Sequence, residues 1–215
     1  MELFSGVGLG LAPGSFHFLT GPSGAGKTTL INLCSGTIVP AAGKIEVFSI
    51  DLAGLDRNGR AALRRRIGVV HQEAGFLNHL SVAENVALPL RISGRLDAGG
   101  RRDVEDLLKW VGLSARAHAR PPELSGGERQ RAALARAVIL SPDLILADEP
   151  TGNVDWEMSQ RLLALLAELN RMGKTVLVAT HDLALIRASR QVLTDRPARV
   201  LRLAAGTLTL AGSDL

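Results

Sequence analysis

The segment Gly21–Thr28 constrains this chain more than any other stretch of its sequence. It reads Gly-Pro-Ser-Gly-Ala-Gly-Lys-Thr, the G-x-x-x-x-G-K-T pattern of a phosphate-binding loop. An apolar run over residues 16–20 precedes it, and residues 29–34 are typical of a helix. In this strand–loop–helix order the backbone N–H groups and the helix N-terminus face one phosphate cluster. The segment therefore predicts a phosphate site, with Lys27 at the β- and γ-phosphates and the Thr28 hydroxyl at Mg²⁺.

The composition sets the class of protein. The chain has 215 residues, of which 46% are hydrophobic, enough for the core of one domain over residues 1–215. No apolar run reaches the roughly 18 residues of a membrane-spanning helix, and residues 1–6 lack the basic start and apolar core of a signal peptide. The single cysteine, Cys34, excludes a disulfide within the chain. We expect a soluble, intracellular protein.

Basic residues outnumber acidic ones, giving a net charge of +4. Arginines cluster at residues 64–66 and 101–102. The simplest interpretation is a pair of solvated helix faces, and contact with an anionic membrane surface is the alternative. Nucleic acid is not an expected partner, because aromatic residues make up only 3% of the chain and do not alternate with the basic ones.

Hydrophobic periodicity predicts strands and helices that alternate along most of the chain, as in an α/β fold with a parallel sheet. The expected strands are two within residues 2–20 joined at Pro13-Gly14, one over 44–50 in a small antiparallel sheet, then 67–71, 144–148 and 175–180, and a terminal hairpin of 199–203 and 207–211. The expected helices outside residues 73–124 are 29–34, 60–66, one from residue 125 to about 140, and 158–171.

Residues 73–124 contain helix signals but no apolar strand pattern, unlike the rest of the chain. They predict a helical subdomain that extends to about residue 140. The sequence Ser81-Val82-Ala83-Glu84 is a capping box, and its helix is expected to end before Pro89. A second helix is expected over residues 101–111 after two glycines. This region interrupts the parallel sheet between two of its strands.

Polar residues follow four of the apolar strands, namely Thr20, Gln72, Asp148-Glu149 and His181. The carboxyl ends of parallel strands meet at one edge of a sheet, where ligands bind, so we expect these side chains to surround a nucleotide with its Mg²⁺. A carboxylate at Asp148 reaches the metal, and Glu149 polarises attacking water. Gln72 contacts both metal and water, while His181 donates toward the γ-phosphate. The ordinary alternatives are a helix cap for Asp148, an acceptor behind the site for Glu149 and a structural role for His181.

The run Leu124-Ser125-Gly126-Gly127-Glu128 predicts a second anion site, since it joins glycines to a capped helix N-terminus. Each chain already has one phosphate-binding loop, so a second phosphate-binding segment would contact a nucleotide held by another copy of the chain. This arrangement predicts a head-to-tail homodimer with two ATP molecules at its interface. The alternative is an ordinary capped helix start.

Together these motifs resemble the ATP-binding subunits of ABC transporters. The matches, in the family's order, are Walker A (21–28), the Q-loop at Gln72, the signature (124–128), Walker B (144–149), the D-loop (Asn153–Asp155) and the H-loop at His181. The resemblance implies a P-loop NTPase core with an antiparallel β-subdomain and an inserted α-helical subdomain, and an ATPase activity. It implies catalytic roles for Lys27, Gln72, Glu149 and His181 and metal ligation by Thr28, Gln72 and Asp148. It implies ATP contacts from Gly21, Pro22, Ser23, Gly24, Ala25, Gly26, Lys27, Thr28, Thr29, Ser125, Gly126, Gly127 and Glu128.

Finer features narrow the resemblance to one subgroup. Residues 147–155 are similar to the ADEPTGNLD run of the lipoprotein-release, macrolide-efflux and cell-division ATPases, and residues 18–28 and 84–90 look most like the cell-division members. Those members imply a peripheral protein on the cytoplasmic face of the bacterial inner membrane, with an integral four-helix partner and a role in cell-wall remodelling. The alternative is the ATPase subunit of a lipoprotein-release or macrolide-efflux transporter.

One family feature is missing. The family has an aromatic residue upstream of Walker A that stacks on adenine, but the chain has no tyrosine and only Phe4 is a candidate substitute. Stacking on an aromatic is worth about 1–3 kcal/mol, so ATP would be held more loosely without it. This keeps open an ATP-sensing module that hardly hydrolyses its nucleotide. A DNA-repair ATPase is disfavoured because no long coiled-coil insertion is present.

Overall fold

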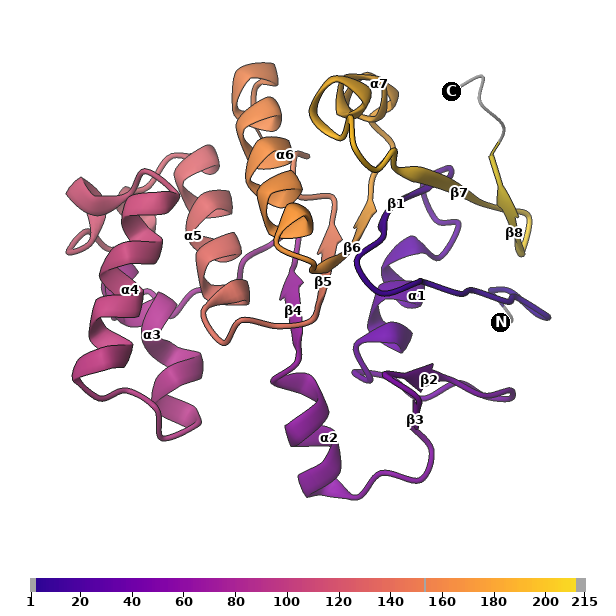
Figure 1. The fold of residues 1–215 in the computed structure, drawn as a ribbon, viewed down its shortest axis with the longest axis horizontal. Coiled ribbons are helices and arrows are strands. Elements are labelled where there is room, and N and C mark those ends of the chain that lie inside the picture. Colours follow the sequence, from indigo (N-terminus) through magenta and orange to yellow (C-terminus); the bar gives the residue numbers. More distant parts are fainter. Residues whose placement is uncertain (1–2, 153, 212–215) are drawn as a thin grey trace.

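A six-stranded sheet organises the structure, a computed structural model that describes residues 3–152 and 154–211 (Figure 1). In chain order the elements are β1 (Phe16–Thr20), α1 (Lys27–Cys34), β2 (Glu46–Val47), β3 (Ile50–Asp51), α2 (Arg57–Arg64), β4 (Ile67–Val70), α3 (Val82–Ile92), α4 (Ala98–Trp110), η1 (Ser114–Arg116), η2 (Pro121–Glu123), α5 (Gly126–Val138), β5 (Leu144–Asp148), α6 (Trp156–Arg171), β6 (Thr175–Ala179), α7 (Leu183–Val192), β7 (Arg199–Ala204) and β8 (Thr207–Leu210).

The strands lie in the order β4-β5-β6-β1-β7-β8, and all pairs are parallel except the final β7–β8 hairpin. The registers bring strand ends level: Val70 pairs with Ala147, and Ala179 pairs with both Asp148 and Leu19. The residues that follow β1, β4, β5 and β6 therefore emerge at the same edge of the sheet. This confirms the predicted α/β fold with a mostly parallel sheet and a C-terminal hairpin.

Continuous apolar strands are explained by burial on both faces of the sheet. In β5, Ile145 and Ala147 pack with α5, α6 and α7, whereas Leu144 and Leu146 pack with α1 and the small β2–β3 sheet. Because side chains alternate along a strand, these four apolar positions contribute to two cores at once. In Figure 1, α6 and α7 lie on the opposite side of the sheet from α1.

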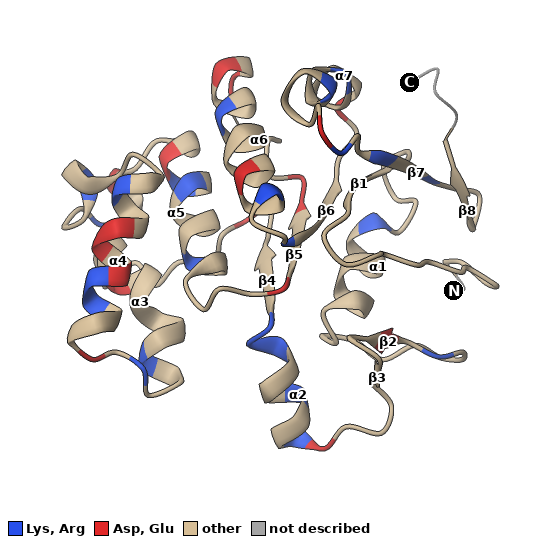
Figure 2. Cartoon of the chain, in the orientation of Figure 1, with Lys and Arg blue, Asp and Glu red and all other residues tan. Residues whose placement is uncertain are grey.

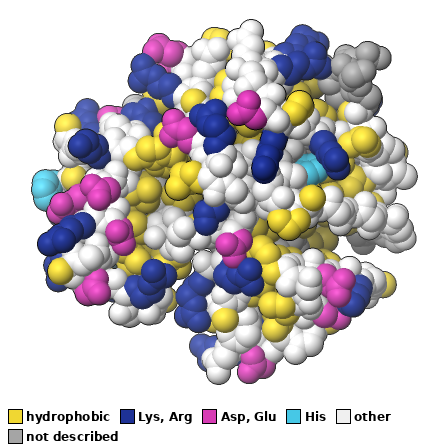
Figure 3. Space-filling model, viewed as in Figure 1, with side chains coloured by type: hydrophobic (Ala, Val, Ile, Leu, Met, Phe, Trp, Pro, Cys, Tyr) yellow, Lys and Arg dark blue, Asp and Glu magenta, His cyan; other side chains and the backbone are white. Residues whose placement is uncertain are grey.

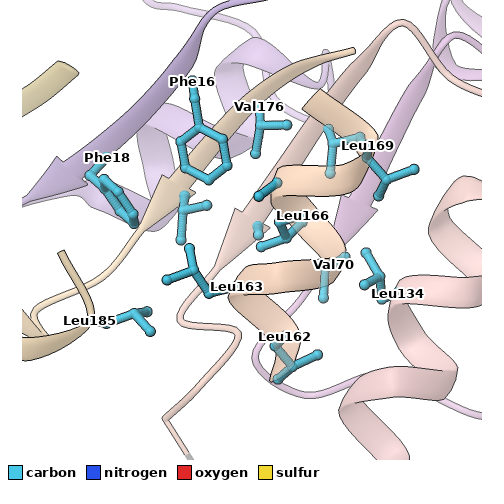
Figure 4. Packing of buried hydrophobic residues seen from close by; sticks show 14 of the residues in the cluster. Phe16, Phe18, Val70, Leu134, Leu162, Leu163, Leu166, Leu169, Val176 and Leu185 are labelled. Carbon is cyan, nitrogen blue, oxygen red and sulfur yellow. The ribbon is translucent and has the colours of Figure 1, made fainter. Parts of the chain in front are cut away.

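The first core forms where β1 meets α6 (Figure 4). Phe16 and Phe18 stack at a ring-centroid distance of 5.2 Å and a tilt of 48°, a favourable aromatic arrangement. Leu163 and Leu166 of α6 are fully or almost fully buried against the same strands. The strand that leads into the phosphate loop is thereby fixed by large apolar side chains on one face.

A separate core holds the helical region between β4 and β5 together. It consists of apolar side chains from α3 and α4, of Leu113 and Leu124, which flank the short helices η1 and η2, and of the small residues Ala132 and Ala135 of α5. Helix α5 contributes to the sheet-covering core with Ala133 and Leu134. This helix is therefore shared by the helical region and the sheet, on different sides of its axis.

Helix α3 does not end before Pro89, as predicted, but continues to Ile92. Proline inside a helix costs about 3 kcal/mol because it removes a backbone hydrogen bond and crowds the preceding turn. Val86 and Leu90, on either side of Pro89, are almost completely buried in the helical core. Their burial, about 1.5–3 kcal/mol each, offsets the cost and keeps the backbone helical.

Four helices begin two or three residues earlier than predicted; α1 begins after Gly26, and the other three each begin after an aspartate. The carboxylates of Asp56, Asp97 and Asp155 accept backbone N–H groups at 2.7, 2.9 and 2.8 Å in the first turns of α2, α4 and α6. An aspartate cap satisfies donors that the helix itself leaves unpaired. The predictions for residues 60–66, 101–111 and 158–171 overlooked these caps.

The single strand predicted over residues 44–50 is instead a tight hairpin. Strands β2 and β3 pair antiparallel, and Phe48 and Ser49 form the turn with φ angles of 54° and 63°. Two successive residues with positive φ are the requirement of a type I′ turn, which suits the twist of a hairpin. The predicted antiparallel pairing is right, but the turn lies within the run rather than after it.

The first of the two strands predicted within residues 2–20 is absent from the described part of that segment. Residues 3–15 have no strand, although Leu9 and Leu11 pack against the second core. Glycines at positions 6, 8 and 10 remove three side chains that a strand would pack against its neighbours. The alternation at Leu9 and Leu11 thus reflects the packing of these side chains against the core, without strand pairing.

Arginines 64–66 form the expected basic face of α2 only in part (Figure 2). Arg64 donates to the Gly36 carbonyl at 2.8 Å, while Arg66 pairs with Asp143 at 2.7 Å and lies 3.9 Å from the Phe48 ring centroid. On the face shown in Figure 3, acidic and basic side chains are interspersed. Within residues 3–152 and 154–211, no helix combines the length and apolar character needed to cross a membrane.

Gly68 allows β4 and α5 to approach closely, and the Gly68→Ala substitution tests this contact. A methyl group there would lie 2.5 Å from the Ala137 carbonyl oxygen and 3.0 Å from Pro142 Cγ. Overpacking against backbone cannot relax cheaply, so we expect the free energy of unfolding to fall by about 1–3 kcal/mol. Urea unfolding monitored by circular dichroism measures the change.

The matched control for this substitution is Gly54→Ala. No atom lies within 4 Å of a methyl group placed on Gly54. Its unfolding free energy should stay constant or rise by less than about 1 kcal/mol. Equal losses in both variants would show that the β4–α5 contact is not tight.

His17 makes the fold sensitive to acid. It lies buried in β1 with its Nδ1 3.2 Å from Ser15 Oγ, and burial, with a smaller contribution from Arg199, lowers its pKa below the ordinary 6.5. The unfolded chain therefore binds a proton more readily, and stability is lost as pH falls through 6.5 toward the lowered pKa. The unfolding free energy of the wild type should decline more steeply below pH 6.5 than that of His17→Gln. The exposed-site variant His118→Gln should follow the wild type, and parallel curves for all three chains would contradict the prediction.

Candidate functional site

The loop between β1 and α1 has the backbone shape of an anion cradle. Gly21, Gly24 and Gly26 have φ angles of 156°, 78° and 98°, which side chains disfavour. Gly26 occupies the N-cap position of α1 and provides no side-chain cap. The first N–H groups of α1 therefore have no side-chain acceptor, and together with the helix dipole they favour an anion.

Two distant segments support this loop. A methyl group on Gly21 would lie 2.1 Å from the Leu203 carbonyl oxygen of β7, and one on Gly26 would lie 3.0 Å from Phe4 Cε1. The structure thus places the Phe4 ring against the phosphate loop. Its stacking on adenine stays a prediction.

Lys27, the first residue of α1, is only 9% exposed. Its ammonium donates to the carbonyls of Gly21 and Pro22 at 2.9 and 3.3 Å, and its Nζ lies 3.7 Å from Glu149 Oε1. A buried ammonium requires negative or carbonyl oxygens around it. The lysine is thereby held at the centre of the loop, beside the end of β5.

Glu149 contacts two other predicted site residues, Lys27 and His181. Its Oε1 lies 2.9 Å from His181 Nδ1 and its Oε2 is buried without a hydrogen-bond partner. Its backbone has a φ of 45°, a strained value for this residue type that costs on the order of 1–3 kcal/mol. Hydrogen bonds from its N–H to the Ala179 carbonyl (2.8 Å) and from Gly152 N–H to its own carbonyl (3.1 Å) hold that conformation.

Asp148 ends β5 and is 5% exposed, yet its Oδ1 has no hydrogen-bond partner. An unpaired buried carboxylate oxygen is unfavourable unless a cation or donor is supplied. Mg²⁺ prefers oxygen ligands, typically one or two carboxylates with waters and phosphate oxygens, so this residue fits the ion. The side-chain amide of Gln72 lies near Gly152, 3.6 Å from where a methyl group on that glycine would sit. Thr28 is exposed in the first turn of α1.

The signature segment forms the predicted capped helix start. Ser125 Oγ accepts the Glu128 N–H at 3.2 Å, and Glu128 Oε2 accepts the Ser125 N–H at 2.8 Å. That N–H, together with Arg116 beside Glu128 Oε1, lowers the pKa of the Glu128 carboxyl. Ser125 and Gly126 are exposed, and Met158 of α6 packs against Gly127.

The structure brings some of the predicted residues together and leaves others apart. Lys27, Glu149 and His181 form one cluster, with Asp148 adjacent in sequence to Glu149. The signature begins α5, which lies well apart from α1 in Figure 1. Of the predicted D-loop, Asn153 lies outside the described residues, and Asp155 caps α6.

Sequence reasoning missed two side chains that contact the Gln72 segment. Gln130 Nε2 donates to the Gln72 carbonyl at 3.1 Å, and Arg136 donates to the carbonyls of Ala74 and Gly75. Both lie inside α5, where polar residues are normally taken as solvent-facing. Side-chain hydrogen bonds to a distant backbone carbonyl leave no periodic pattern in the sequence. The only available signal was that these two polar residues lie within an alanine-rich helix.

Comparison with known proteins agrees with this geometry. Residues 4–152 match the model of the ABC transporter family. The cell division ATP-binding protein FtsE of Escherichia coli K12 is 46% identical over 194 residues, which cover 90% of this chain and 87% of FtsE. The methionine import ATP-binding protein MetN 2 of Burkholderia pseudomallei is 45% identical over 183 residues, covering 85% of this chain, which spans about half (46%) of that relative's length.

A solved structure is similar over almost the whole chain. It is a dimeric post-hydrolysis state of the ATP-binding cassette MJ0796 bound to ADP and phosphate, with a TM-score of 0.85 and 33% identity over 96% of this chain and 88% of that one. A family match over most of the chain, a relative of similar length and a shared fold agree with the phosphate loop and the Lys27–Glu149–His181 cluster. The chain therefore belongs to the ABC transporter family.

Proposed function

We propose that the chain is an FtsE-like ATPase that dimerises around two Mg-ATP and drives an integral membrane partner. The observation that carries the proposal is the cluster at the end of β1, β5 and β6. There the buried Lys27 ammonium, the Glu149 carboxylate and His181 surround the phosphate loop, next to an unpartnered oxygen of Asp148.

Each residue of the cluster suits one task in phosphate hydrolysis. Lys27 exchanges its loop carbonyls for the β- and γ-phosphate oxygens of ATP. Thr28, Gln72 and Asp148 would hold Mg²⁺, which supplies neutralisation of the charge on the phosphate oxygens. The loop N–H groups at the start of α1 bind the remaining phosphate oxygens.

Glu149 is the group that accepts a proton from attacking water. Its Oε2 has no protein partner, while its Oε1 is oriented by His181 at 2.9 Å. The strained backbone fixes the carboxylate without consuming Oε2. His181 is then placed between the carboxylate and the γ-phosphate, to which it donates when ATP is bound.

The second copy completes each nucleotide site through its signature. Ser125 and Gly126 are exposed at the N-terminus of α5, apart from the chain's own phosphate loop. We place Ser125 and Gly127, together with the rest of residues 124–128, against the ATP of a partner copy. The dimeric state named for the similar cassette MJ0796 supports this arrangement.

The membrane partner is expected to be FtsX-like, on the cytoplasmic face of the bacterial inner membrane, with the helical region 73–124 as the contact surface. The proposal rests on the similarity to FtsE, whose length the chain nearly matches. ATP cycling would then act in cell division and cell-wall remodelling. The alternative, an ATPase subunit of a lipoprotein-release or macrolide-efflux transporter, uses the same site residues with a different partner.

The Glu149→Gln substitution tests the catalytic assignment. It keeps the shape of the side chain but removes the proton acceptor, so turnover should fall about 10²–10⁴-fold. ATP binding should persist, and dimers should accumulate because the nucleotide at the interface is not consumed. Phosphate release and size-exclusion chromatography with ATP and Mg²⁺ measure the two effects.

The control for this experiment is the exposed residue Glu105 of α4, which lies outside the site. Glu105→Gln should hydrolyse ATP at the wild-type rate and form no persistent dimer. Undiminished hydrolysis by Glu149→Gln would overturn the general-base role. Arrested hydrolysis without dimers would overturn the composite interface.

The partner is tested by using Glu149→Gln as bait on detergent-solubilised membranes of the source organism with ATP and Mg²⁺. Mass spectrometry of the captured proteins should identify an integral membrane protein with four spanning helices, enriched over a bait that also carries Lys27→Ala. Capture of a larger permease would move the function to transport. In that outcome the cell-division assignment fails and the ATPase assignment stands.

A further inference from the structure

The first turn of α5 carries a negative charge where the proposed dimer brings in a phosphate. Glu128 is the third residue of this helix, in the same turn as the exposed Ser125 and Gly126. Under the proposed function, this turn contacts an ATP molecule held by a partner copy. An ionised carboxylate beside the phosphates weakens that contact unless a cation compensates it, because like charges placed together across an interface are unfavourable.

Both oxygens of the Glu128 carboxylate have partners within the chain. Oε2 accepts the Ser125 N–H at 2.8 Å, and Oε1 accepts Arg116 Nε at 3.1 Å. The Ser125 N–H, together with Arg116, lowers the pKa of this carboxyl, so Glu128 is ionised at neutral pH. Its charge therefore stays in the turn, paired with the guanidinium of Arg116.

The other two arginines of this part of α5 make different contacts. Arg129 donates to two carbonyls of η2 at 3.1 and 3.4 Å, and Arg131 Nη1 lies 2.6 Å from the Met158 sulfur. Among residues 3–152 and 154–211, Arg116 is the cation within ion-pair distance of Glu128. The compensating charge thus comes from outside the helix.

The backbone around Arg116 is held by hydrogen bonds. Arg116 ends η1, where its N–H donates to the Leu113 carbonyl at 2.9 Å and its carbonyl accepts the Ala119 N–H at 3.0 Å. The first two residues of α3 donate to the carbonyls of Ala117 and Ala119, each at 2.9 Å. A fixed segment therefore presents the guanidinium to the first turn of α5.

We propose that Arg116 is a positioning residue for the nucleotide of the partner copy and that it acts through Glu128. Its guanidinium neutralises the carboxylate that caps the signature, so the cap is kept without repelling the γ-phosphate. Ser125 Oγ accepts the Glu128 N–H at 3.2 Å and still has its hydroxyl proton to donate to phosphate. The Arg116 side chain is 51% exposed, and an ion pair so exposed adds little to folding stability. The role rests on the proposed function, since it needs the signature to meet a partner's ATP.

The test measures how much ATP is needed to form the dimer. In the Glu149→Gln background, with Mg²⁺ and about 0.05 M salt, size-exclusion chromatography with light scattering gives the ATP concentration for half-maximal dimer. Adding Arg116→Gln leaves the charge of Glu128 uncompensated, so we expect this concentration to rise about tenfold. Arg116→Lys keeps a cation at this position and should recover most of the loss.

A double-mutant comparison isolates the effect of the charge. Glu128→Gln keeps an oxygen that can accept the Ser125 N–H but removes the negative charge. When it is present, adding Arg116→Gln should change the ATP concentration for half-maximal dimer by less than about twofold. Raising the salt to about 0.5 M should also reduce the effect of Arg116→Gln alone, because dissolved ions screen exposed charges but not packing.

The matched control breaks another exposed ion pair, at β2, which lies well apart from α5 in Figure 1. Lys44 Nζ lies 2.7 Å from Glu46 Oε1, and both side chains are more than half exposed. Lys44→Gln should dimerise as its parent chain does at both salt concentrations. The midpoint of thermal unfolding should be close to that of the parent in every variant, since exposed ion pairs add little to folding stability.

The possible results separate the role of Arg116 from the proposed function. An unchanged ATP requirement in Arg116→Gln, beside a parent that dimerises, would overturn the role and leave the proposed function intact. An equal loss with and without Glu128→Gln, or a loss that salt does not reduce, would also overturn it, because Arg116 would then act through the fold rather than through charge. If the Glu149→Gln parent forms no dimer with ATP, the composite interface and the role of Arg116 fail together. If Arg116→Gln does not fold, Arg116→Met in the two Glu128 backgrounds decides.

Discussion

The position of β1 between β6 and β7 is the constraint on which the rest of the structure depends. Two parallel ladders and the Phe16–Phe18 face against α6 fix this strand, so the loop after it must emerge at the sheet edge where β5 and β6 also end. The Lys27 ammonium therefore lies close to Glu149, although the two motifs are far apart in the sequence. The clustering of polar residues at this edge follows from the strand order. Hydrophobic burial aligns the strands, and the polar residues just beyond their ends become neighbours.

Much of this arrangement could be predicted from sequence because its signals are local or periodic. The glycines of the phosphate loop, the apolar strands β5 and β6 and the Ser125–Glu128 capping box each carry a recognisable pattern, and the structure has them where predicted. What failed depended on tertiary context. Pro89 stays within α3 because Leu90 is buried beyond it, and the β2–β3 turn uses two non-glycine residues with positive φ. Local propensity cannot foresee either compensation.

The site itself divides in the same way. The identity of Asp148, Glu149 and His181 could be predicted from their places after apolar strands, but not the strained φ of Glu149 or the unpartnered oxygens of both carboxylates. Those features arise from hydrogen bonds between elements, such as the one from Glu149 N–H to the Ala179 carbonyl. The backbone of β5 is fully hydrogen-bonded by its neighbours, while one oxygen of each carboxylate has no protein partner, which suits the cation and the water molecule that we propose there.

Helix α5 contacts several separate parts of the fold. Its first turn presents Ser125 to solvent, its small side chains Ala132 and Ala133 pack into different cores, and Gln130 and Arg136 reach the Gln72 segment. A helix that packs on two sides moves as a rigid unit, because close-packed cores are not freely deformable. The sheet, the helical region and the segment after β4 therefore hold α5 in one position along its length.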